Sequence, residues 1–168
     1  AIGKIDQREG IIKDITIETG LPFICVNQVG ANTELIFDGT SCVFSADGKK
    51  VLTCASFESD FQLYTLGQKT EIEDIERDPL ADMYHSLILG VKDYYQKTGF
   101  FNGVLLGLSG GIDSAVTCAI AALALGPEKV TGITMPSRYS SEGSVSDSEA
   151  LAKNLGIELL EIPIADIV

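Results

Sequence analysis

The sequence has few cationic side chains, with 12 Lys and Arg against 24 Asp and Glu in 168 residues, and a formal net charge of −12. Proteins that bind nucleic acids or anionic membranes depend on Lys and Arg to neutralise phosphate groups. The charge therefore argues against both kinds of partner, nucleic acid and membrane. Any phosphate that binds this chain must be held by a local arrangement of hydrogen-bond donors.

Long apolar runs are missing as well. No run reaches the roughly 18 residues of a membrane span, and the first residues, AIGKIDQREG, contain no apolar stretch of the signal-peptide kind. Apolar residues make up 45% and charged residues 21%, which is typical of a folded globular protein. We therefore expect a cytoplasmic protein that contains one domain or parts of two.

Residues for metal or nucleophilic chemistry are scarce. The four cysteines form no C-x-x-C pair and have apolar neighbours, whereas a nucleophilic cysteine needs basic surroundings and a zinc site needs clustered ligands. The one histidine, His85, lies in an amphipathic stretch. We interpret His85 as a structural or surface residue and the cysteines as buried thiols. They are Cys25, Cys42, Cys54 and Cys118.

The first part of the chain has the composition of a sheet. Residues 21–30, 33–48 and 49–66 are rich in Val, Ile, Phe and Thr and are interrupted by turn residues, which predicts strands. A helix is expected over 7–20, ending at a glycine. Residues 67–78 are polar and acidic, which favours a linker over an acidic binding patch.

The second part alternates between helix and strand. Residues 78–99 open with Asp-Pro, carry an apolar stripe at helical spacing and end at a glycine. The order that follows is βαβαβ, which predicts a parallel, doubly wound sheet. The expected strands are 103–108, 129–135 and 157–164, and the expected helices are 113–126 and 144–156.

A glycine-rich loop, SGGIDS, follows the first of these strands. Gly110 and Gly111 permit positive φ and close approach of a ligand, and the next helix begins with free N–H groups, so the loop favours an anion. The sequence matches neither G-x-x-x-x-G-K-[ST] nor G-x-G-x-x-G. Ser109 and Ser114 offer hydroxyl donors, and Asp113 offers a ligand for a divalent cation. The alternative is a tight turn in which Asp113 only caps its helix.

Two segments carry a resemblance to known ligases. GLSGGIDS, residues 107–114, resembles the pyrophosphate-binding loop of ATP pyrophosphatase ligases, which have an adenine nucleotide α hydrolase-like fold. GITMPSRYSSEGSVSDSEALAKNLGIE, residues 132–158, resembles the corresponding segment of glutamine-dependent NAD synthetases. Taken alone, the second segment is equally compatible with a serine-rich surface loop.

The N-terminal part carries a separate resemblance. Residues 20–52, which include NQVGAN and FDGTS, are similar to the carboxyl-terminal half of the nitrilase-like amidase domain that is fused to NAD synthetases. Taken alone, NQVGAN is also compatible with a strand end and a turn. The resemblance implies an α/β fold: the end of a nitrilase-like sandwich (1–66), a linker (67–78) and the start of the doubly wound synthetase domain (79–168).

The resemblance implies an activity and a set of binding residues. The intact enzymes amidate deamido-NAD with ammonia from glutamine, through an adenylated intermediate, and release AMP and pyrophosphate. The implied substrates are deamido-NAD, ATP and glutamine, with Mg²⁺ as the metal at Asp113, no tightly bound organic cofactor, and a homo-oligomeric assembly. Lys4 corresponds to a lysine near glutamine. The implied ATP-binding residues are Gly107, Leu108, Ser109, Gly110, Gly111, Ile112, Asp113, Ser114, Met135 and Arg138.

The chain departs from the family in extent. The Glu, Lys and Cys triad of the amidase lies upstream of the matching segment, so none of its catalytic residues is present here. We therefore expect an interior fragment that is inactive alone. Two alternatives stay open: another ATP pyrophosphatase ligase, such as a GMP synthetase, and a non-catalytic nucleotide-binding fragment.

Overall fold

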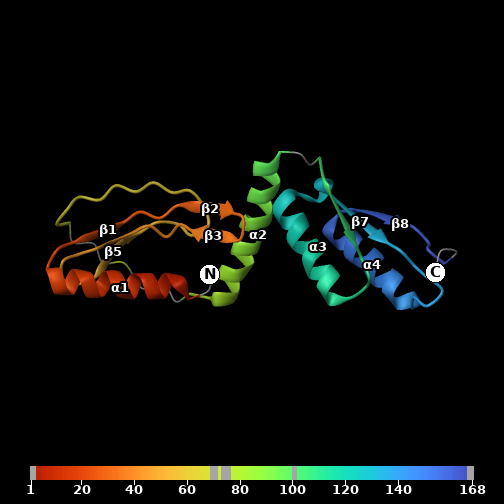
Figure 1. Ribbon diagram of the computed structural model, residues 1–168, viewed down its shortest axis with the longest axis horizontal. Coiled ribbons are helices and arrows are strands. Elements are labelled where there is room, and N and C mark those ends of the chain that lie inside the picture. Colours follow the sequence, from red (N-terminus) through yellow and green to blue (C-terminus); the bar gives the residue numbers. More distant parts are fainter. Residues whose placement is uncertain (1–2, 69–71, 73–76, 100–101, 166–168) are drawn as a thin grey trace. The chain divides into compact units, whose positions relative to one another are not determined.

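The computed structural model describes residues 3–68, 72, 77–99 and 102–165. Its contacts divide the chain into two compact units, Ala1–Gly90 and Val91–Val168, shown in sequence colours in Figure 1. The division falls within helix α2, Pro79–Thr98. Most of the linker expected at 67–78 lies outside the described residues, so the domain boundaries inferred from the sequence stay a prediction.

Among its described residues, the first unit contains one helix and five short strands before α2, and these strands pair antiparallel. One sheet has the order β1-β4-β5, and β2 and β3 form a separate two-stranded sheet. The elements are α1 (Lys4–Thr19), β1 (Phe23–Cys25), β2 (Val29–Asn32), β3 (Leu35–Asp38), β4 (Cys42–Phe44) and β5 (Lys50–Thr53).

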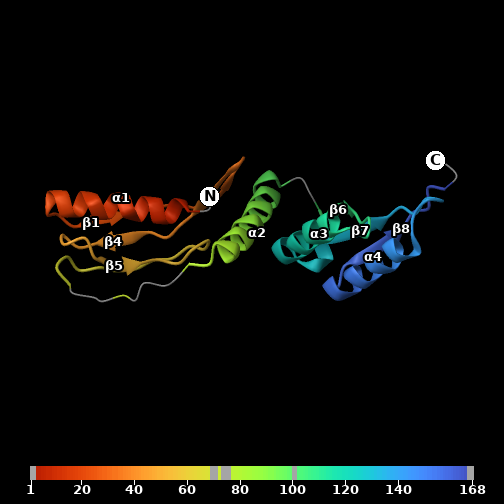
Figure 2. The same ribbon diagram turned by 90° about the horizontal axis from the view of Figure 1, so that it is seen from below.

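Helix α1 lies along one side of β1, β4 and β5 (Figure 2). Its Ile12 is buried with Cys42 and Phe44, and Phe23 and Cys25 pack against them at the edge of this core. The strand register places Cys25 directly opposite Cys42. All four cysteines are free thiols, of which Cys42 and Cys118 are buried as expected and the other two are half-buried.

The strand predicted over 49–66 is wrong beyond Thr53, where β5 ends. The carboxylate of Asp60 accepts hydrogen bonds from the backbone N–H groups of Ala55 (2.9 Å) and Phe61 (2.7 Å). These bonds form a turn and occupy donors that a sheet ladder would need. The alternating apolar residues Phe61 and Leu63 are therefore 82% and 85% exposed.

Helix α2 confirms the Asp-Pro start. Asp78 caps it, because the Asp78 carboxylate accepts the backbone N–H of Leu80 at 2.9 Å. None of its residues is buried, and Leu80 and Tyr94 of the predicted stripe are 69% and 62% exposed. Within the described ranges, neither α2 nor any other helix combines the length and apolarity needed to cross a membrane.

The second unit confirms the βαβαβ order. Its three strands form a parallel sheet in the order β6-β7-β8. The carboxyl ends of the parallel strands therefore share one edge. The elements are β6 (Val104–Gly107), α3 (Ile112–Leu125), a short 3-10 helix η1 (Pro127–Lys129), β7 (Val130–Thr134), α4 (Glu142–Leu155) and β8 (Glu158–Glu161).

Both helices of this unit pack on one face of the sheet. Cys118 of α3 and Ala152 of α4 are buried in the same core as Val130 of β7. Side chains that point to the other face stay open, with Leu105 68% and Leu160 42% exposed. Because α3 follows β6 and α4 follows β7, both helices begin at the carboxyl edge of the sheet.

Candidate functional site

The glycine-rich loop connects β6 to α3 at the carboxyl edge of the sheet. Gly110 has φ +75°, the left-handed conformation that favours glycine. Gly111 is the residue that precedes the first turn of α3, and no side chain caps this helix. Asp113 is the second residue inside the helix, so the alternative role of Asp113 as the helix cap is wrong.

Two serine hydroxyls hold the shape of this loop. Ser114 Oγ accepts the backbone N–H of Ser109 at 3.3 Å and donates to the carbonyl of Gly111 at 2.9 Å. Ser109 Oγ accepts the N–H of Gly111 at 3.3 Å. The N–H groups in the first turn of α3 have no helical acceptor and stay available to an anion.

Gly110 also packs against the start of α4. A Cβ on Gly110 would lie 2.6 Å from Ser144 Cα and 2.7 Å from the Ser144 carbonyl oxygen. The sequence suggested that this glycine leaves room for a ligand. The structure adds a second reason, because any larger residue would push the loop away from α4.

Residues of the loop line two hollows. One, of about 320 Å³, is lined by Gly107, Leu108, Ser109 and Met135 from the predicted set. The other, of about 420 Å³, lies between the start of α3 and the middle and end of α4. It is lined by Leu108, Gly110, Gly111, Ile112 and Ser114 from the predicted set, together with residues of α4.

The smaller hollow also contains residues outside the predicted ATP-binding set. Thr134 ends β7 and Pro136 follows it, while Ser140 lies just before α4 and Ser144 lies in its first turn. A signal was present, because serines directly after the second strand of a parallel sheet must lie at the same edge as the loop after the first.

Two predicted residues lie outside both linings. Asp113 is exposed, and its carboxylate makes no hydrogen bond within the described part of the chain. Arg138 is exposed on the turn after β7, where its guanidinium donates to the carbonyl of Ala165 at 3.1 Å. The ATP-binding roles of both residues stay predictions.

A metal would need ligands beyond this loop. Among the residues that the structure describes, no group of three His, Cys, Asp or Glu side chains lies close enough to hold an ion. The exposed Asp113 carboxylate provides one hard oxygen ligand of the type that Mg²⁺ prefers. The site therefore fits a metal ion that is coordinated by Asp113 and by phosphate oxygens of a bound ligand.

Lys4 belongs to the first unit and lies at the first position of α1. Its Nζ donates to Gln7 Oε1 at 2.9 Å, and it is exposed to solvent. Together with Arg8, Lys4 lines a hollow of about 460 Å³ that is otherwise mostly apolar, with Ile12, Phe23 and Cys25 among its walls.

Comparison with known proteins gives consistent matches. Residues 83–168 match the family model described as NAD synthase. Two curated relatives, both named glutamine-dependent NAD(+) synthetase, come from Synechocystis sp. and Acinetobacter baylyi and are 44% and 37% identical to this chain. The matches cover 98% and 93% of this chain but 30% of each relative, so the chain spans about 30% of their length.

Solved structures agree with the sequence matches. Glutamine-dependent NAD+ synthetase from Acinetobacter baumannii, solved in complex with ADP, has a TM-score of 0.87 and 36% identity, and covers 99% of this chain and 32% of its own. A glutamine-dependent NAD(+) synthetase from Cytophaga hutchinsonii has a TM-score of 0.82 at 17% identity, and covers 99% of this chain and 34% of its own. The second likeness supports the fold alone.

Proposed function

Because its residues 83–168 match the NAD synthase family model, the chain belongs to that family, and we propose that it contributes an ATP site to a glutamine-dependent NAD synthetase. In the proposed reaction, the nicotinate carboxylate of deamido-NAD attacks the α-phosphate of ATP and pyrophosphate leaves. Ammonia then displaces AMP and forms the amide. The product is NAD.

The loop between β6 and α3 is the observation that supports this proposal most strongly. It presents Gly110 at positive φ, two serine hydroxyls and the open first turn of α3 at one edge of a parallel sheet. Donors fixed in this way stabilise the charge that develops on leaving pyrophosphate. The A. baumannii relative was solved in complex with ADP, which supports an adenine nucleotide as a ligand of this protein.

Each part of the proposed site has a role. The backbone of 107–114 holds the phosphates, Met135 lies beside the nucleotide, and Arg138 offers a cation to it. Asp113 would hold Mg²⁺ together with phosphate oxygens, and the ion would neutralise charge on the pyrophosphate. We propose no tightly bound organic cofactor.

We assign the first part of the chain to the amidase. Residues 1–66 would be the end of a nitrilase-like domain that releases ammonia from glutamine, 67–78 a linker, and 79–168 the start of the synthetase domain. Lys4 would lie near glutamine. The proposed enzyme acts on deamido-NAD, ATP and glutamine in the cytoplasm as a homo-oligomer.

The test is product analysis on a full-length protein that contains these residues. With deamido-NAD, MgATP and either glutamine or ammonium, we expect NAD, AMP and pyrophosphate in equal amounts. Formation of GMP from xanthosine monophosphate would support the alternative ligase. ATP binding without any AMP release would support a non-catalytic nucleotide-binding role.

A further inference from the structure

A cluster of polar side chains ties the first turns of α1 to the strands of the first unit. The Arg8 guanidinium donates to both carboxylate oxygens of Asp38, with Nη1 to Oδ1 at 3.2 Å and Nη2 to Oδ2 at 2.9 Å. Thr40 Oγ1 donates to Asp38 Oδ2 at 2.7 Å, and Asn27 Nδ2 donates to Asp38 Oδ1 at 3.0 Å. We call these four residues the Arg8 clamp.

The clamp connects several elements of the fold. Asp38 ends β3, Asn27 lies between β1 and β2, and Thr40 is a buried residue that precedes β4 with φ +49°. A residue other than glycine keeps a positive φ only where its surroundings hold it there. Because the Arg8–Asp38 contact is bidentate, it fixes the orientation of the guanidinium relative to the carboxylate as well as the distance between them.

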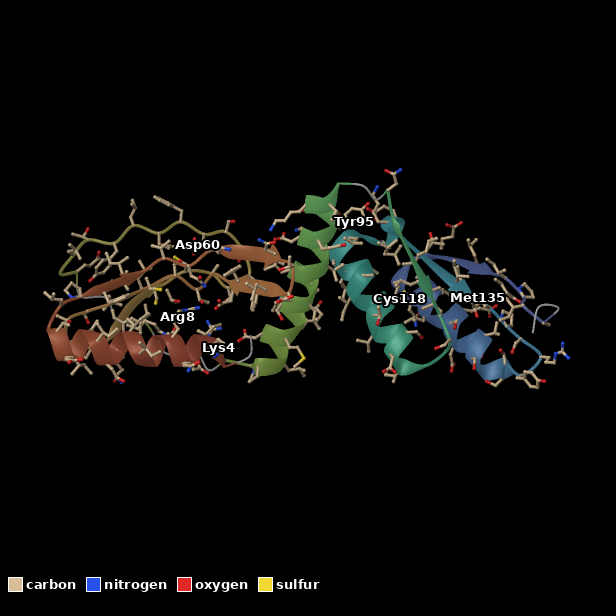
Figure 3. All side chains as sticks on the ribbon, viewed as in Figure 1. Lys4, Arg8, Asp60, Tyr95, Cys118 and Met135 are labelled. Carbon is tan, nitrogen blue, oxygen red and sulfur yellow. The ribbon has the colours of Figure 1, made fainter. Side chains whose placement is uncertain are left out.

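Within its first turn, α1 makes few side-chain contacts that hold the helix in place. Gly3, which precedes the first turn, makes no side-chain capping bond, and among the described residues the Lys4 side chain has one hydrogen-bond partner, Gln7 of its own helix. Ile5 is the one buried side chain in this turn. Lys4 and Arg8 are four residues apart, so they lie on the same face of the helix and line the same hollow (Figure 3).

We propose that Arg8 is a positioning residue, and that its clamp on Asp38 sets where Lys4 lies for glutamine. This inference rests on the proposed function, in which Lys4 lies near glutamine. Arg8 itself does not touch the substrate. It fixes the helix that carries Lys4, and a loosened helix leaves the Lys4 ammonium misplaced.

Steady-state kinetics on a full-length protein that contains these residues tests the proposal. Arg8→Lys keeps the positive charge but loses the bidentate hydrogen bonds to Asp38. We expect it to raise the glutamine KM about tenfold, because small misplacements of binding groups are costly. NAD formation from ammonium should stay within about twofold of the wild type, since that reaction does not use glutamine.

Glu9→Gln is the matched control. Glu9 is the next helix residue, and its 2.8 Å ion pair with Lys50 is as shielded as the Arg8 pair and also ties α1 to a strand. We expect a similar change in melting temperature for both variants but an unchanged glutamine KM for Glu9→Gln. Equal KM increases in the two variants, or none in Arg8→Lys, would overturn the proposal.

Two further measurements separate this proposal from the function on which it rests. If the wild-type protein makes no NAD from ammonium, the proposed function is wrong. If Lys4→Met leaves the glutamine KM unchanged, the assigned role of Lys4 is wrong, and the positioning role of Arg8 fails with it.

Discussion

The two units differ in whether their polar and charged groups are already paired within the protein. In the first unit, Arg8 and Asp38 are both largely shielded from water and already paired, and so are Lys50 and Glu9. In the second unit, segment 109–114 contains no charge that is paired with another described residue. It offers hydroxyls, open N–H groups and the exposed carboxylate of Asp113.

This difference distinguishes a contact that maintains a fold from one that is kept for a ligand. A shielded charge is costly unless it is paired, so the Arg8 clamp has to be complete before any substrate binds. Exposed donors at a helix start keep their hydration until an anion replaces the water. The contrast predicts that changes in the loop affect nucleotide chemistry, and that changes in the clamp affect stability and glutamine use.

Gly110→Val is expected to have the largest effect. Its Cβ would collide with the backbone of Ser144, and valine disfavours the φ of +75°. We expect ATP-dependent NAD formation in the full-length protein to fall at least about a hundredfold, because the loop is displaced. Glutamine hydrolysis should remain measurable.

Gly143→Ala is the control for this substitution. It lies in the first turn of α4, where a new Cβ would meet nothing nearer than 3.9 Å. Synthesis by this variant should be unchanged. If Gly110→Val made NAD at the normal rate, the loop could not be the phosphate site.

Asp113→Asn sharpens the comparison by removing an exposed charge without changing shape. Because Asp113 does not cap the helix but lies in its first turn, the helix should lose only the small stabilisation that an acid there gains from the helix dipole. We expect adenylation to slow by about tenfold with a higher magnesium requirement, since the carboxylate is the proposed metal ligand. Glu149→Gln, which changes an exposed acid on a different helix, α4, is the control. Normal magnesium dependence of Asp113→Asn would rule out the metal role.

Ser114→Ala tests whether the serines shape the loop. The variant loses the bonds from Ser109 N–H and to the Gly111 carbonyl. We expect the ATP KM to rise about threefold, in line with the loss of exposed neutral hydrogen bonds. An unchanged KM would mean that the glycines alone set the conformation. Thr117→Val, which removes a hydroxyl bonded within the same helix, is the control.

The smallest expected effect is on stability in acid. Burial by itself raises the pKa of Asp38, but hydrogen bonds from Arg8 and Thr40 and the Arg8 charge outweigh burial, so the pKa is lowered. The stabilisation of the folded state by the ionised Asp38 carboxylate is complete above the unfolded-state pKa of about 3.9. It is lost as the pH falls through the folded-state pKa of Asp38.

Thermal melts from pH 6 to pH 3 measure this loss. The difference in melting temperature between the wild type and Asp38→Asn should stay constant above about pH 5 and shrink below it. A difference that does not change with pH would show that the Asp38 carboxylate has no special pairing in the folded state.

Much of the second unit could be predicted from its sequence. Hydrophobic periodicity and turn residues are local signals, and they located its three strands and two helices. The sequence predicted the start of α4 two residues too late, because the capping residue, Ser141, is one of several neighbouring serines that could each cap a helix. The contact between Gly110 and Ser144 joins residues 34 positions apart, and no local pattern reports it.

The first unit was less predictable. Phe61 and Leu63 alternate as strand residues do, yet Asp60 turns the backbone before a ladder can form. The pairing of Arg8 with Asp38 spans 30 residues, and a single sequence does not indicate which acid a given arginine meets. The resemblance identified the parts of the family, but these contacts came only from the structure.

The facing pair Cys25 and Cys42 has a consequence for oxidation. Closing a disulfide between them requires a thiolate on Cys42. Burial raises the pKa of Cys42 to about 12, so its thiolate is scarce at neutral pH. Scarcity of the thiolate slows disulfide formation between two thiols that the strand register holds opposite each other.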